Sequence, residues 1–539
     1  MQLPYFWDEA GYYVPAARDL WLTGSLIPHS TPSNAHPPLV MAYLAFWWRL
    51  VGYSPLITRS AMCLLSSFSL LGLFKLAQQV ANTQVAWGTA LCAAIYPVFY
   101  VESSLAQVDL AAAGFTFWGL YAYAAGKKPA TAAWFSLAAL SKETAILAPA
   151  ALFAWNLFRG WRGRGHPEIR SERKRIAFWS SLLFPLVPLM FWYGFHYLKT
   201  GYLLGNPEFF RYNVQATLSP IRIVIALGLR LWQSFGYMHL GFLSVAMLLA
   251  LMLPPIVDAG QERPRIALDL QFDFLAVLIV YLLFMAFVGG AVLARYMLPV
   301  VPLVILVAVS TLWRRVRYWR VVLLGVIASF AIALFFNPPY GFSIEDNLAY
   351  RDYIQLHQDG ERFLEARYPM ASVLTAWPAS DELTRPYLGY VTRPLRVVRI
   401  EDFTLEEVMW AAEVSSKYDV ALVFSTKYEP SHPLMGEWLA WQRIKTRYFG
   451  YHRDLPPAAT AQLLGGRIVF TEKRDGQWVA VIEMERAVEA ETRDPWRGDN
   501  SRACGRRGVT SSLGGKSGSS IPAILRVQLT GVASPVRIR

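Results

Sequence analysis

Two adjacent carboxylates, Asp8 and Glu9, stand shortly before the first of many apolar segments in this chain. Ionisable side chains at the edge of a membrane-embedded body are costly, and they usually mark function. A carboxylate in such a place could act as a general base that takes a proton from an attacking hydroxyl group. A solvated loop pair or a charge at a helix N-terminus is the alternative, and the residues alone leave both interpretations open.

A third acid, Asp109, follows an apolar segment that ends at Pro97. The distribution of basic residues, described below, places Asp109 on the same face as Asp8. Two acids on one face could bind a divalent cation, or could hold the amine or hydroxyl of an acceptor. A helix N-cap or first-turn acid is the alternative for Asp109.

Two cations also interrupt or border apolar segments. Lys142 and its neighbour Glu143 break an apolar run, and Arg295 precedes Tyr296 at the start of another. Lysine offers a point charge to a phosphate, whereas arginine binds a phosphate through two parallel hydrogen bonds. An internal Lys–Glu ion pair and an arginine that extends toward the interface are the alternatives.

The composition defines the class of protein. Of the 539 residues, 55% are hydrophobic and only 17% are charged, against about 25% charged in soluble domains. The apolar segments do not alternate with period two, which argues against a β-barrel and for a polytopic α-helical membrane protein. The net charge of +13 comes largely from short basic runs between apolar segments, so we expect no nucleic-acid partner. The three cysteines show no disulfide framework and no metal spacing.

A membrane-spanning helix needs about 20 apolar residues. The predicted segments are 56–78, 83–101, 106–125, 129–140 with 144–158, 177–198, 236–253, 273–290, 296–312 and 321–336.

The basic runs predict the orientation of these segments. If the runs at 127–128, 159–175, 263–265 and 314–320 face the cytoplasm, every crossing alternates correctly. The candidate acids and cations then lie outside the cytoplasm, together with a loop over 199–235 and everything after 337. Segment 39–52 is short and carries Trp47, Trp48 and Arg49, which predicts an interfacial helix. Met1 would then start outside, so a helix upstream of this start is expected.

Four regions follow from these patterns. Residues 1–55 are expected to form an extracytoplasmic acidic loop with the interfacial helix, and 56–336 the transmembrane domain. In residues 337–486, short β-branched runs such as 371–377 and 420–424 alternate with helix-like stretches, which predicts an extracytoplasmic α/β domain. Residues 487–539 are of low complexity and are expected to be disordered.

The order of these motifs along the chain resembles membrane glycosyltransferases of the GT-C class. The closest likeness is to glycosyltransferase family 39, the group of the protein O-mannosyltransferases and the lipid A aminoarabinose transferases. The matching motifs are Asp8-Glu9, Ala35-His36-Pro37-Pro38-Leu39, the stretch from Pro97 to Asp109, Lys142-Glu143 and Arg295-Tyr296.

The resemblance implies roles for particular residues. Asp8 stands at the position of the family's presumed catalytic acid, and Glu9 and Asp109 join it as catalytic candidates. The implied substrate-binding residues are Tyr12, His36, Lys142, Glu143, Arg295 and Tyr296. Gly11 and Ala35 stand where aminoarabinose transferases have an arginine and an acid, which argues against lipid A aminoarabinose transfer and leaves a divalent cation as an open expectation.

The expected function is transfer of a sugar from a polyprenyl-phosphate carrier to a protein, lipid or glycan at the outer face of the inner membrane, with inversion. A transporter or flippase is one alternative, although such folds show inverted repeats that are not visible here. A non-enzymatic envelope assembly factor, whose outer domain binds a partner, is the other.

Overall fold

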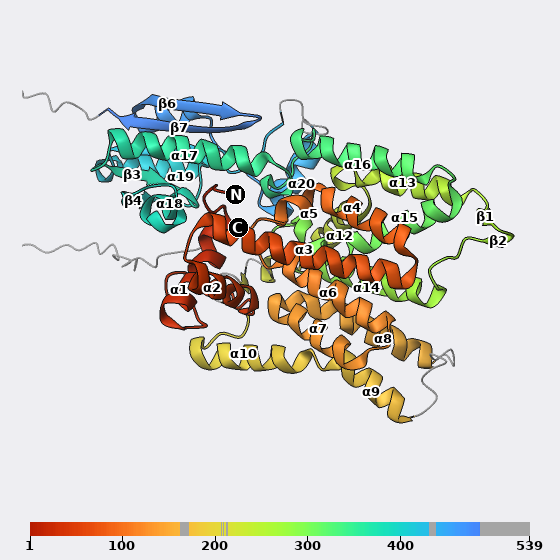
Figure 1. The fold of residues 1–539 in the computed structure, drawn as a ribbon. Coiled ribbons are helices and arrows are strands. Elements are labelled where there is room, and N and C mark those ends of the chain that lie inside the picture. Colours follow the sequence, from red (N-terminus) through yellow and green to blue (C-terminus); the bar gives the residue numbers. More distant parts are fainter. Residues whose placement is uncertain (162–171, 206, 208–209, 212–213, 431–437, 486–539) are drawn as a thin grey trace, which may run out of the picture.

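The computed structural model combines a body of long helices with a smaller α/β domain (Figure 1). This confirms the fold class expected from the sequence. The expected disordered tail, 487–539, lies outside the described residues. The structure describes residues 1–161, 172–205, 207, 210–211, 214–430 and 438–485.

Apolar composition and helix-start signals define the helical body. At the start of α3, for example, the Ser54 hydroxyl accepts a hydrogen bond from the backbone N–H of Ile57, and Pro55 occupies the first turn. Pro97 divides the predicted segment 83–101 into two helices. The helices are α3 (Pro55–Val80), α4 (Thr83–Ile95), α5 (Pro97–Glu102), α6 (Asp109–Ala124), α7 (Lys128–Ser141), α8 (Leu147–Trp161), α9 (Glu172–Leu183), α10 (Leu186–Thr200), α12 (Pro220–Phe235), α13 (Leu240–Leu251), α14 (Leu268–Phe287), α15 (Val301–Arg315) and α16 (Trp319–Phe335).

Within the described residues, four helical stretches are long and apolar enough to cross a membrane. One of them, Pro220–Leu251, includes α12, which lies in the segment 199–235 that the sequence predicted as an outer loop. The prediction was wrong over 220–235 because Arg222, Arg230 and Gln233 lower the local hydropathy. In the fold these side chains are buried and donate hydrogen bonds to backbone carbonyl groups.

The two ends of the helical body differ in character. A hairpin of β1 (Val257–Asp258) and β2 (Gln261–Glu262) projects from one end, and the α/β domain covers the other (Figure 1). The hairpin precedes the basic pair Arg263 and Arg265, so this basic run and the α/β domain lie at opposite ends, as the charge pattern predicts.

The α/β domain is built on a five-stranded sheet of order β4-β3-β5-β7-β6. The first three strands are parallel and the last three antiparallel. β3 and β5 match the apolar runs predicted as strands, and all five residues of β5 are buried. The strands are β3 (Ser372–Thr375), β4 (Arg396–Arg399), β5 (Val420–Phe424), β6 (Gly466–Arg474) and β7 (Gln477–Met484), with helices α17 (Ala349–Arg367), α18 (Ala379–Thr384), α19 (Leu405–Glu413), α20 (Leu439–Phe449) and α21 (Pro457–Leu464).

The N-terminal segment is folded rather than a loop. A π-helical turn, η1 (Glu9–Tyr13), runs into α1 (Val14–Thr23), and α2 (Leu39–Val51) forms the short helix expected at 39–52. Tyr5 and Phe6 are buried in a hydrophobic cluster that also contains Tyr353 of the α/β domain. Burial of these aromatic side chains fixes the acidic segment between that domain and the helical body.

Close packing of α3 against α6 depends on a glycine. A Cβ at Gly114 would lie 2.6 Å from Cβ and 3.1 Å from the backbone Cα of Ser69. Small residues at such contacts allow two membrane helices to approach closely. These two helices carry Arg59 and Asp109, so their separation affects the site described below.

We predict that Gly114→Ala lowers the free energy of unfolding by about 1–3 kcal/mol, because the added methyl group forces the helices apart. Gly325→Ala in α16, where nothing lies within 4 Å of the new Cβ, is the matched control. Melting temperatures of the purified proteins in detergent compare the two. Equal melting temperatures for Gly114→Ala and the control would contradict the close contact.

Candidate functional site

A cavity of about 3530 Å³ lies between the helical body and the α/β domain. Four of the predicted site residues on its wall come from distant parts of the chain, namely Asp8, His36, Lys142 and Arg295. Tyr12, Glu143 and Tyr296 also line it. Seven of the nine sequence-predicted residues therefore line one cavity, whereas Glu9 and Asp109 do not line it.

Arg295 is the centre of the polar wall. It lies on η5 (Ala294–Met297), is 2% exposed, and forms ion pairs with Asp8, Asp109 and Glu345. Its Nε lies 3.3 Å from Oδ2 of Asp109. Asp8 precedes η1, Asp109 begins α6 and Glu345 lies on η6 (Ile344–Asp346). One guanidinium group therefore joins three separate elements.

Lys142 is the second cation of this cluster. Its Nζ lies 2.6 Å from Oδ1 of Asp109 and 4.0 Å from the ring centroid of Tyr296. Asp109 is only 3% exposed and does not line the cavity. It therefore contacts both cations on their side away from the cavity. Three carboxylates face two cations in this cluster, which leaves one negative charge if every group is ionised.

Glu9 points away from the cavity, although it is adjacent to Asp8. It is fully buried and forms an ion pair with Arg59, whose Nη2 lies 2.9 Å from Oε2. The same carboxylate accepts hydrogen bonds from the backbone N–H groups of Phe6 and Ala106. These contacts tie the N-terminal segment to α3 and to the loop before α6, and we predict from them a structural role for Glu9.

The first loop completes the wall. Nδ1 of His36 lies 2.8 Å from Oε2 of Glu143, so the two predicted substrate-binding residues form a pair. The pair links the 24–38 loop to the turn between α7 and α8, next to Lys142.

Local backbone geometry aims Asp8 at the cavity. Trp7 adopts φ of 45°, a region that bulky residues rarely occupy, and the π-helical turn follows at once. A Cβ at Gly11 would already lie 3.0 Å from the Trp377 ring of the α/β domain. The Trp377 ring therefore occupies the space beside Gly11.

Sequence reasoning missed Glu345 and Asp346. Gln107 donates a hydrogen bond of 3.1 Å to Glu345, and Tyr237 donates one of 2.6 Å to Asp346. Burial, reinforced by the charge of Glu345, raises the pKa of Asp346 to about 7. The sequence does contain one indication of these residues. Glu345 and Asp346 form an acidic pair shortly after the last predicted apolar segment, on the same predicted face as Asp8.

Arg230 was also missed, because α12 was not expected. Its Nη1 donates to the backbone carbonyl of Leu293, and its Nε donates to that of Met285. These bonds brace the segment that leads into Arg295.

Comparison with known proteins supports the family resemblance. Residues 35–195 match the model of the dolichyl-phosphate-mannose-protein mannosyltransferase family. The matched stretch includes His36, Asp109 and Lys142, and it ends before Arg295. The resemblance inferred from the sequence is confirmed over this stretch, and it supports a membrane glycosyltransferase of the GT-C class. No curated protein is significantly similar in sequence to this chain.

Solved structures that are loosely similar to the chain include the following three. ArnT from Cupriavidus metallidurans in the apo state has 15% identity and a TM-score of 0.48 over 89% of this chain and 94% of that chain. ArnT bound to undecaprenyl phosphate has 14% identity and a TM-score of 0.47 over the same shares. The Archaeoglobus fulgidus oligosaccharyltransferase in complex with Zn and sulfate has 11% identity and a TM-score of 0.41 over 78% and 64%. At such TM-scores no residue role is transferred.

The buried Glu9–Arg59 pair gives a direct prediction. Removing one partner of a buried ion pair leaves an uncompensated charge, so Arg59→Met is expected to lower the free energy of unfolding by about 3–5 kcal/mol. Arg362→Met removes an arginine that is 62% exposed and is expected to change it little. Thermal unfolding in detergent measures both.

Glu9→Gln separates the structural role from a catalytic one. A destabilised Glu9→Gln protein supports the structural role. A Glu9→Gln protein as stable as the wild type but inactive would contradict it.

Proposed function

We propose that this protein transfers a sugar from a polyprenyl-phosphate carrier to an acceptor hydroxyl or amine at the surface of the membrane, with inversion at the anomeric carbon. The observation that carries the proposal is the convergence of Asp8, Lys142 and Arg295 on one cavity wall beside apolar helices. Base and phosphate-binding cations are the groups that such a transfer requires.

The proposed roles follow from position. Arg295 and Lys142 bind the phosphate of the carrier and stabilise the charge that develops on it as the bond from the anomeric carbon to the phosphate oxygen breaks. Asp8, which is 22% exposed, takes the proton of the acceptor as that acceptor bonds to the anomeric carbon. The polyprenyl phosphate is the leaving group. Asp109 positions the two cations.

The ion pair of Asp8 with Arg295 suggests an order of events. In the structure the Arg295 guanidinium group engages the Asp8 carboxylate, so that carboxylate does not yet face an acceptor. Arrival of an anionic phosphate gives Arg295 a competing partner and leaves Asp8 available to the acceptor. Binding of the donor thereby prepares the base. Lys142 and Arg295 both form ion pairs with Asp109. The proposed reaction therefore needs no divalent cation between Asp8 and Asp109.

The predicted location is the inner membrane, with the cavity and the α/β domain outside the cytoplasm. The basic pair Arg263 and Arg265, which follows the hairpin at the opposite end of the helical body, supports this orientation. The α/β domain supplies part of the cavity wall, including Trp377, Arg385 and Lys427, so we propose that it contacts the acceptor.

We predict that Asp8→Asn lowers turnover by about 10²–10⁴-fold, the range expected for loss of a general base, while the protein still folds and expresses, because Asp109 and Glu345 remain to balance Arg295. Transfer from a radiolabelled polyprenyl-phosphate sugar to membrane acceptors measures turnover. Glu413→Gln, an exposed acid of α19 that does not line the cavity, is the matched control and should keep wild-type turnover.

Wild-type activity of Asp8→Asn would overturn the assignment of the base. If cells that carry Asp8→Asn and cells that carry Arg295→Lys both show the wild-type phenotype, the assembly-factor alternative is favoured. Arg295→Lys keeps the charge and loses the planar pair of donors, so it should weaken donor binding.

A further inference from the structure

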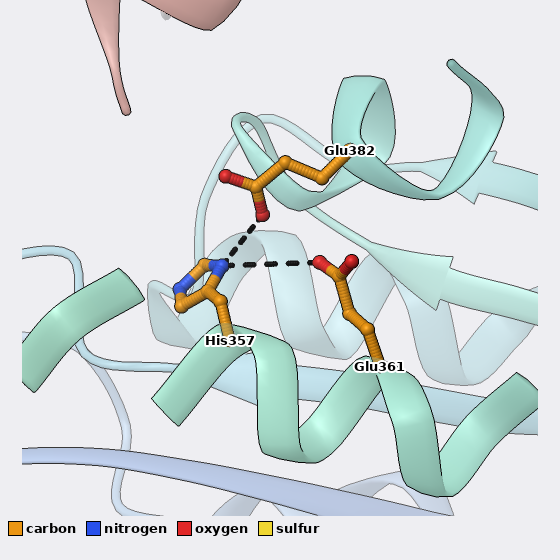
Figure 2. A group of neighbouring side chains, drawn as sticks. All are labelled: His357, Glu361 and Glu382. Atoms are coloured by element: carbon orange, nitrogen blue, oxygen red, sulfur yellow. Dashed lines mark hydrogen bonds and ion pairs between the residues drawn. The ribbon is translucent and has the colours of Figure 1, made fainter. Parts of the chain in front are cut away.

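A second charged cluster lies inside the α/β domain, away from the cavity. His357 and Glu361 stand one turn apart on α17, and Glu382 stands on α18. Figure 2 shows the two carboxylates pointing toward the same imidazole ring from different helices. All three side chains are at least 99% buried.

The distances within the cluster are short. Nδ1 of His357 lies 2.6 Å from Oε2 of Glu382 and 4.0 Å from Oε1 of Glu361. One ligand atom from each side chain lies within 4.8 Å of the other two. In a tetrahedral zinc site with bonds of about 2.0 Å, the ligand atoms are about 3.3 Å apart, so modest side-chain rotation reaches this geometry.

The polar atoms of the cluster lack other partners. Among the described residues, neither oxygen of Glu361 forms a hydrogen bond, and Oε1 of Glu382 forms none. Two buried carboxylates beside one imidazole leave negative charge that the cluster itself does not balance. The cluster therefore requires either a shared proton or a cation.

We propose that His357, Glu361 and Glu382 bind one divalent transition-metal ion, with Zn²⁺ as the ion that this ligand set suits. Imidazole and carboxylate are ordinary zinc ligands, and a carboxylate that binds through both oxygens or a water molecule completes the coordination. The ion would join α17 to α18 and neutralise the excess charge. This site is structural, and it does not depend on the proposed sugar transfer.

The site would also fix the position of the acidic segment. The His357 ring stacks on Tyr353 with centroids 4.2 Å apart, and Tyr353 contacts Trp7 at 5.9 Å. Trp7 also packs on Trp377, just before α18, at 4.9 Å. A metal that joins α17 to α18 therefore fixes the positions of Tyr353 and Trp377, the two side chains that contact Trp7 next to Asp8.

The experiment uses the full-length protein in detergent, stripped with a chelator and then dialysed against one equivalent of Zn²⁺. Bound zinc is measured by mass spectrometry, and the melting temperature is measured with and without zinc. We expect about one zinc per wild-type chain and a rise in melting temperature on zinc addition. Glu361→Gln should weaken zinc binding at least about tenfold and lose that rise. Glu365→Gln changes an acid one turn further along α17, and it should behave as the wild type.

The alternative is a proton shared between Glu361 and Glu382. Glu361→Gln resembles that state, because the amide is neutral like a protonated carboxyl group. A wild-type protein that retains no zinc and shows no zinc-dependent melting temperature would overturn the proposal. So would a Glu361→Gln variant that binds zinc as the wild type does. If Glu361→Gln does not fold, the stripped and reloaded wild type decides by itself.

Discussion

The buried guanidinium group of Arg295 is the interaction on which the site depends. A buried charge is tolerated only when partners balance it, and the desolvation penalty is several kcal/mol per ion. Asp8, Asp109 and Glu345 supply that balance, and they come from three different elements. The same requirement that keeps Arg295 charged therefore holds the N-terminal turn, α6 and the connection to the α/β domain together. Lys142 adds a second cation through Asp109.

The rest of the fold serves to bring these elements to one place. The Glu9–Arg59 pair and the shared hydrophobic cluster fix the N-terminal segment against both α3 and the α/β domain. The π-helical turn points the Glu9 side chain into the protein and the Asp8 side chain toward the cavity, so the two adjacent carboxylates have different surroundings. A pair of acids in sequence is thus divided into one anchoring residue and one exposed residue.

Much of the site could be predicted from the sequence, because topology decides which loops share a face. The basic runs place Asp8, Asp109, Lys142 and Arg295 at one end of the helices, and the structure brings these four residues together. The direction of Glu9 could not be predicted, since adjacent residues diverge only once the π-helical turn is known. Glu345 was missed because its partner is 50 residues away along the chain, and no local pattern marks a tertiary ion pair.

The fold was predicted with similar success and for similar reasons. Long apolar helices and the buried strand β5 have clear signals in hydropathy and β-branching. The helix α12 has no such signal. Its Arg222 and Arg230 side chains are buried and donate hydrogen bonds to carbonyl groups, and a hydropathy pattern does not register these bonds. The metal-ligand spacing of His357 and Glu361 was not recognised, since the third residue, Glu382, comes from another helix.

A structure of the wild-type protein with a polyprenyl phosphate bound would show which groups hold the phosphate of the carrier. We expect the phosphate to lie against Arg295 and Lys142, and the Asp8 carboxylate to have separated from Arg295 and to face the cavity. A phosphate bound elsewhere on the cavity wall, for example at Lys427 and Lys445, with Arg295 still paired to Asp8, would contradict it.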